Sequence, residues 1–101
     1  INPNIEKIAE LDSRGLIVSA RGIATDFTSR VFSPNVGVDE DPVTGSAHAL
    51  LATYWSKVLN LKKMKARQAS KRGGELICEV LKNHVEITGK AKLYLRGEIY
   101  F

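Results

Sequence analysis

The clearest periodic pattern along the chain is helical and lies between residues 45 and 59. Its apolar positions recur at intervals of three and four residues, as on the buried face of an amphipathic helix. They are Ala47, Leu50, Leu51, Tyr54, Trp55, Val58 and Leu59. Because Ala49 and Ala52 add small residues on the other side, we expect protein to cover this helix around much of its circumference, as if a sheet wrapped it.

Shorter elements precede this central helix. Ile5, Ile8 and Leu11 follow helical spacing and predict a short helix over residues 2–12, with Asn2 as a possible cap and Pro3 in the first turn. Residues 16–20 are apolar on both faces, which is typical of a buried strand. Residues 27–32 are rich in aromatic and β-branched side chains and predict a second strand.

The part of the chain after the central helix favours strands. The predicted strands are residues 64–69, 76–81, 85–88 and 91–101, with turns at 73–74, 82–83 and 89–90. This order predicts an antiparallel meander. One long helix against about six strands indicates an α+β domain, and 101 residues suit a single domain over residues 1–101.

Composition narrows the class of protein. A hydrophobic content of 44% and a charged content of 26% are ordinary for a globular domain and exclude general disorder. No run reaches the roughly 20 apolar residues of a membrane helix, and the first residues lack a signal-peptide pattern, so we expect a cytoplasmic protein without membrane contacts. The chain begins with Ile1, which indicates a processed or excised piece. The one cysteine, Cys78, lies among apolar residues and is expected to be a structural thiol.

The net charge of +4 leaves nucleic-acid binding open. The basic residues that gather after the central helix are Lys62, Lys63, Lys65, Arg67, Lys71 and Arg72. They alternate with Met64, Ala66 and Gln68, as in a strand that turns its charges to water. No aromatic residues are interleaved to stack on bases, so we expect a solvated strand and no nucleic-acid partner.

A loop over residues 35–44 leads into the start of the central helix and carries the candidate chemistry. Helix starts leave backbone N–H groups unpaired and carry partial positive charge, so Thr44-Gly45-Ser46 is a potential anion site that suits a substrate carboxylate. Gly45 permits close approach, Thr44 or Ser46 can cap the helix or donate to a ligand, and Asp41 can present a carboxylate. A capped helix with acids near its positive end, and no ligand, explains the same pattern.

Residues 41–48 read DPVTGSAH, and this stretch resembles the signature of the PhzF-like (phenazine biosynthesis F-type) isomerase family. The resemblance extends to RVFSP at residues 30–34 and QASKRGG at residues 68–74, and it covers essentially the whole chain. It implies a diaminopimelate-epimerase-like fold of two similar lobes, each a mostly antiparallel curved sheet around a central helix, with the active site between them. This chain matches the C-terminal lobe only.

The resemblance also implies the roles of site residues. Asp41 is expected to face the substrate, while Gly45 and Ser46 help to bind it without a cofactor. The acid/base glutamate of the phenazine enzyme belongs to the first lobe, and no residue here matches it. The chain is therefore expected to hold half of a site and to need the N-terminal lobe for activity.

Three further side chains have open roles. Arg30 can pair with a substrate carboxylate, or form a salt bridge with Asp39 or Glu40. His48 is expected to pack or to support the helix start, because no second histidine or cysteine sits at metal-ligand spacing. His84 is expected on the surface.

The leading hypothesis is an isomerase lobe that moves protons on a small carboxylated metabolite. The alternative is an inactive module that binds a ligand or a protein. A lobe of a two-lobed protein should expose an apolar face where its partner lobe or a second copy sits, so we also expect a homo-oligomer.

Overall fold

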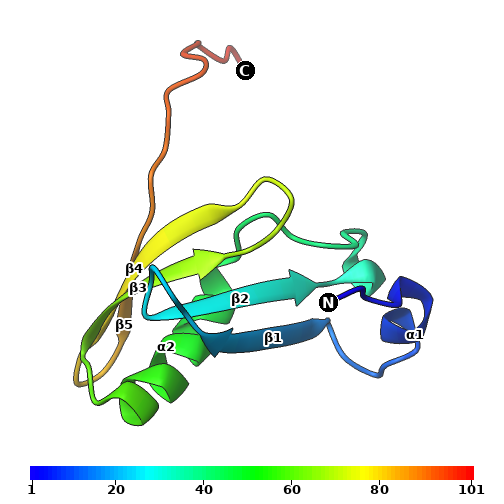
Figure 1. Ribbon diagram of the computed structural model, residues 1–101. Helices are drawn as coiled ribbons and strands as arrows, with labels where there is room; N and C mark the ends of the chain where they lie inside the picture. The colour runs from blue at the N-terminus through cyan, green and yellow to red at the C-terminus, as the bar shows by residue number, and fades with distance from the viewer.

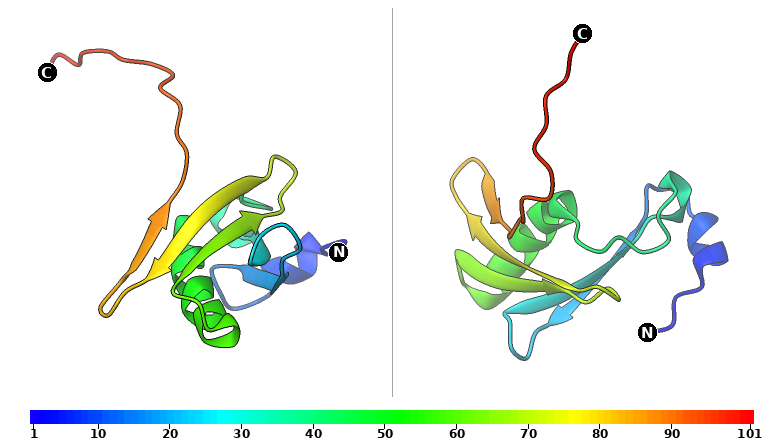
Figure 2. Two further views of the ribbon diagram at one scale, coloured as in Figure 1. Left: turned by 60° about the vertical axis from the view of Figure 1, so that its left-hand side comes forward. Right: turned by 90° about the horizontal axis from the view of Figure 1, so that it is seen from above.

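The computed structural model describes residues 1–101 and contains one five-stranded sheet in the order β1-β2-β3-β4-β5. The strands are β1 (Leu16–Arg21), β2 (Phe27–Phe32), β3 (Lys63–Gln68), β4 (Gly74–Val80) and β5 (Val85–Thr88). The helices are α1 (Ile5–Ala9), the 3-10 turn η1 (Pro34–Val36) and α2 (Gly45–Leu59). Helix α2 lies across one face of the sheet, as the views in Figures 1 and 2 agree. The fold is α+β, as predicted.

The sheet is mostly antiparallel but is not a continuous meander. Strands β1 and β2 form a hairpin, and β3, β4 and β5 form a meander, yet β2 and β3 pair in parallel. A parallel pair requires a crossover connection, and α2 provides it. The antiparallel meander predicted for the strands after the central helix is confirmed for β3, β4 and β5.

The core lies between α2 and the sheet. Its buried residues are Phe27, Leu51, Ala52, Trp55, Met64, Ala66, Leu76 and Cys78. The ring of Phe27 stacks on Trp55 with centroids 5.9 Å apart, and Trp55 Nε1 donates to Ser19 Oγ over 3.2 Å. Cys78 is fully buried in this core, as predicted for a structural thiol, and burial raises the pKa of its thiol to about 11.

Helix α2 has the predicted bounds, but protein does not cover much of its circumference. Leu50, Tyr54 and Val58 form a stripe along the helix, and they are 66%, 57% and 52% exposed. These three residues, here called the α2 stripe, are an exposed apolar face of the kind expected for one lobe.

Two strand predictions need correction. Strand β1 is an edge strand whose residues are half-buried or exposed, so its apolar run does not mark a fully buried strand. Residues 91–101 form no strand and extend away from the sheet in Figure 1, with Leu93, Tyr94 and Phe101 largely exposed. A strand needs a paired neighbour for its backbone groups, and none lies beside this segment.

The first helix is shorter than predicted. It covers Ile5–Ala9, and its cap is Asn4, whose Oδ1 accepts from Lys7 N over 3.0 Å, so Asn2 is not the cap. Ile8 is buried, whereas Leu11 is 45% exposed beyond the end of the helix. None of the helices is long and apolar enough to cross a membrane.

Candidate functional site

The loop between β2 and α2 is fixed from both sides. The backbone N–H of Asp41 donates to Val31 O over 2.9 Å, and Ser70 Oγ donates to Pro42 O over 2.8 Å. Gly74 packs against Val43 so closely that a Cβ at Gly74 would collide with that side chain. The end of β2 and the turn after β3 therefore hold the loop in place.

The carboxylate of Asp41 is half-buried and held from one side. Its Oδ2 accepts from Thr44 Oγ1 over 2.7 Å, and no hydrogen bond reaches its Oδ1. Thr44 is the N-cap residue of α2, but its hydroxyl points to Asp41 and makes no capping bond with the helix. The predicted cap position is confirmed, whereas the capping hydrogen bond is absent.

The start of α2 is open to solvent. No side chain caps it, and no acidic residue lies in its first turn. Gly45 and Ser46 are exposed, and a Cβ at Gly45 would meet no atom within 4 Å. The first N–H groups of α2 thus keep their partial positive charge in a place that a small anion can reach.

These groups line a cavity of about 330 Å³. Asp41, Thr44 and Ser46 are among its polar lining residues, and Ile17, Val31 and Leu50 contribute apolar surface. Three of the predicted site residues therefore meet at one cavity, with Gly45 between them in the chain. Their contact with a substrate stays a prediction.

Arg30 does not line this cavity. Its Nε and Nη2 donate to the two carboxylate oxygens of Glu40 over 2.7 and 3.0 Å, which is one of the two alternatives left open by the sequence. The bidentate pair raises the pKa of Arg30 and lowers that of Glu40 through the hydrogen bonds between them. A substrate contact by Arg30 stays a prediction.

His48 supports the helix start from inside the core. The side chain is fully buried and stacks on Phe27 with ring centroids 5.9 Å apart. Its Nδ1 lies 2.7 Å from Thr44 O, which can only accept, so Nδ1 carries the proton and the neutral ring accepts from Ser29 Oγ at Nε2, 3.3 Å away. The predicted packing and helix-start role is confirmed. His84 is exposed, as predicted, and lies 3.6 Å from Glu86.

The burial of His48 predicts a pH dependence of stability. Burial lowers the pKa of His48 below its ordinary value of 6.5, against the opposing effect of the Thr44 hydrogen bond. The unfolded chain therefore takes up a proton near pH 6.5 that the folded chain binds only at lower pH. The free energy of unfolding should fall as the pH drops below about 6.5.

Urea unfolding at a series of pH values between about 7.5 and 5.5 measures this effect. The slope should disappear in His48→Gln and persist in His84→Gln, which changes the exposed histidine. A wild-type stability that stays flat over this range would show that His48 keeps an ordinary affinity for protons.

Two residues near the site were not predicted from the sequence. Gln68 is fully buried at the end of β3 and binds the loop of Asp41, and Arg14 lines the cavity from the turn before β1. Gln68 does carry a signal, since it follows Met64 and Ala66 on the inner face of a strand, where a polar side chain needs partners. Arg14 carries no such signal in the sequence, because basic residues are common in turns.

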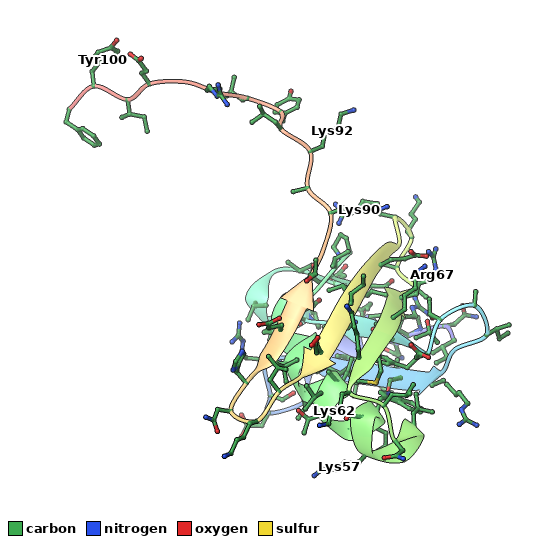
Figure 3. The ribbon with its side chains drawn as sticks, turned by 90° about the vertical axis from the view of Figure 1, so that its left-hand side faces the viewer. Lys57, Lys62, Arg67, Lys90, Lys92 and Tyr100 are labelled. Carbon is green, nitrogen blue, oxygen red and sulfur yellow. The ribbon has the colours of Figure 1, made fainter.

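The basic residues after α2 follow the predicted alternation. Strand β3 buries Met64, Ala66 and Gln68 and exposes the residues between them. Figure 3 shows Lys62, just before β3, well apart from Arg67 near the end of that strand, with Tyr100 far away in the C-terminal segment. No group of three or more potential metal-ligand side chains occurs in the structure.

Comparisons with known proteins agree with these features. The model of a family described as phenazine biosynthesis-like protein matches residues 1–97. An uncharacterized isomerase of Pseudomonas aeruginosa is 50% identical over 96% of this chain and 37% of its own length. The mouse phenazine biosynthesis-like domain-containing protein 1 is 45% identical over 96% of this chain and 35% of its own length.

A solved structure gives the same result. The crystal structure of a PhzF family phenazine biosynthesis protein from Enterococcus faecalis matches 99% of this chain and 39% of its own, with a TM-score of 0.89 and 48% identity. This chain thus spans less than two-fifths of the length of these relatives. Its fold is one lobe of the diaminopimelate-epimerase-like architecture of these proteins. The chain belongs to the PhzF-like family of phenazine biosynthesis-like proteins.

Proposed function

We propose that this chain is the C-terminal lobe, and a single domain, of a cofactor-independent isomerase that transfers protons on a small carboxylated metabolite. The observation that supports the proposal is one cavity that joins the Asp41 carboxylate, the Ser46 hydroxyl and the uncapped start of α2. Relatives that carry the isomerase name agree with this class of reaction.

In this proposal the groups have separate tasks. The N–H groups and Ser46 at the start of α2 bind the substrate carboxylate, because partial positive charge and donors converge there. The free Oδ1 of Asp41 faces the reacting carbon and exchanges a proton with it. Ile17, Val31 and Leu50 keep water from part of the cavity.

The site is complete only with the lobe that the longer relatives contain in addition. We call the protein with both lobes the two-lobed protein. The resemblance to the phenazine enzyme implies that its first lobe supplies an acid/base glutamate opposite Asp41. Two groups on opposite sides of one carbon allow one to remove a proton while the other returns one.

Ser46→Ala in the two-lobed protein tests the binding step. The substitution removes one hydrogen bond to a carboxylated substrate and should weaken its binding by roughly 3- to 10-fold. The effect is modest because the backbone N–H groups at the start of α2 remain. Calorimetric titration measures the change. Thr53→Ala is the matched control, since Thr53 is exposed on the same helix and bonds only to Ala49 O. Equal affinity in Ser46→Ala and wild type would remove Ser46 from the binding site.

We further propose that the α2 stripe and residues 91–101 contact the first lobe or a second copy of the chain. Leu93, Leu95, Ile99 and Phe101 occupy alternate positions of this segment and are exposed, as in a strand that lacks a neighbouring strand. Amide hydrogen exchange over residues 91–101 should be slow in the two-lobed protein and fast in this chain alone. Fast exchange in both would contradict this contact.

The alternative function is a binding module without catalysis. The same cavity would then hold a carboxylated ligand, and Asp41 would only orient it. An unchanged ligand after prolonged incubation with a tightly binding two-lobed protein would favour this alternative.

A further inference from the structure

We propose that Gln68 is a positioning residue that orients the Thr44 hydroxyl toward Asp41 and so fixes the carboxylate for proton transfer. The inference rests on the proposed role of Asp41. It concerns a buried side chain that lies outside the cavity and outside the signature motif at residues 41–48.

The amide of Gln68 is fully used by the loop that carries Asp41. Its Oε1 accepts from Thr44 N over 2.7 Å, and its Nε2 donates to Asp41 O over 2.7 Å. The amide orientation is unambiguous, because the N–H of Thr44 needs an acceptor and the carbonyl of Asp41 needs a donor. One side chain thus bridges the two ends of the 41–44 turn.

A third hydrogen bond sets the direction of the Thr44 hydroxyl. Gln68 Nε2 also donates to Thr44 Oγ1 over 3.0 Å, so the hydroxyl oxygen accepts there and its own proton points to Asp41 Oδ2, 2.7 Å away. The sequence of donors runs from Gln68 through Thr44 to Asp41, and we call it the Gln68 relay. Oδ1 is then the carboxylate oxygen without a hydrogen bond, on a residue that lines the cavity.

The surroundings make the relay rigid. Gln68 is 0% exposed, so water does not compete for its amide. His48 holds the carbonyl of Thr44 over 2.7 Å, and Val31 O holds the N–H of Asp41 over 2.9 Å. A buried network in which every member is satisfied has one low-energy arrangement. No buried side-chain polar atom lacks a partner in this structure.

Substitution of Gln68 separates positioning from binding. In Gln68→Glu the new carboxylate still accepts from Thr44 N, but it attracts the Thr44 proton away from Asp41. The expected result in the two-lobed protein is a fall in kcat on the order of 10- to 10²-fold with little change in KM, because the carboxylate is displaced while the start of α2 still binds the substrate.

Gln68→Met is the second variant, because a buried charge can disturb folding. Its side chain is similar in length and lacks donors, so the amide N–H of Thr44 should exchange with solvent faster than in wild type. This readout does not depend on any activity. It tests the attachment of Gln68 to the 41–44 turn even if the proposed function fails, since slow Thr44 exchange in a folded Gln68→Met protein would show that Gln68 does not hold this turn, and the positioning role would fail.

The catalytic role has its own test in the Asp41→Asn background. If Gln68 acts through Asp41, Gln68→Glu should reduce kcat in wild type but cause no further loss in Asp41→Asn. Thr44→Val removes the hydroxyl that links Gln68 to Asp41, so it should lose about as much kcat as Gln68→Glu. Equal losses in both backgrounds, or an unchanged kcat in folded Gln68→Glu, would overturn the positioning role.

Discussion

Asp41→Asn in the two-lobed protein should lower turnover by on the order of 10²- to 10⁴-fold, the range that a positioned acid/base group contributes. The side-chain amide of asparagine neither accepts a proton from the substrate nor returns one to it. It keeps the volume of the carboxyl and an oxygen that accepts from Thr44 Oγ1, so the hydrogen bond seen here can persist. Stability should change by no more than about 1 kcal/mol.

The matched control is Asp39→Asn, which removes a carboxylate from an exposed position in the same loop. Asp39 does not line the cavity, so its variant should retain wild-type turnover. Steady-state kinetics and thermal unfolding of both variants make the comparison. Near-normal turnover in a folded Asp41→Asn protein would make Asp41 an acid that only stabilises the loop.

The largest loss of stability is expected from Phe27→Ala. Phe27 is 0% exposed, and its ring stacks on those of His48 and Trp55, with centroids 5.9 Å from each. Removal of a buried phenylalanine side chain costs about 3–5 kcal/mol through lost burial and the cavity left behind. Urea unfolding should show a midpoint shifted strongly toward lower urea.

The control for this variant is Ile23→Ala. Ile23 is fully exposed in the turn between β1 and β2, so its replacement should stay within about 0.5 kcal/mol of wild type. A loss below about 1 kcal/mol for Phe27→Ala would mean that the core tolerates the cavity or rearranges around it. The packing of His48 and Trp55 on the Phe27 ring would then contribute little to the stability of the fold.

Local sequence patterns predicted the central helix and the strand alternation well. The bounds of α2 follow from a pattern repeated over four turns, and β3 alternates as its charged and apolar residues do. Apolar positions that face the core and polar positions that face water recur at the period of the helix or strand, and this pattern can be seen in a single sequence.

Features that depend on distant neighbours were not predictable in the same way. The edge position of β1 and the missing strand at residues 91–101 depend on which strands lie alongside, and an apolar run is the same in either case. The parallel pairing of β2 with β3 depends on the crossover through α2.

The candidate site was predicted only in part, because some of its contacts join residues that are far apart in the sequence. Asp41, Thr44 and Ser46 are close in sequence, so their meeting at one cavity follows from a loop that ends in a helix start. Gln68 is 24 residues from its partner Thr44, and the bond between them appears only when β3 lies beside the loop. Sequence spacing could not decide the partner of Arg30, because its positive charge suits both Glu40 and a substrate carboxylate.

The most direct test of the proposed proton transfer is solvent exchange in ²H₂O with the two-lobed protein, free of added cofactor. A carboxylated metabolite that the protein converts should acquire deuterium at the reacting carbon, followed by NMR or mass spectrometry. We expect incorporation in wild type and Asp39→Asn, and a loss on the order of 10²-fold or more in Asp41→Asn. Equal incorporation in Asp41→Asn and wild type would contradict the proposal that Asp41 moves the proton.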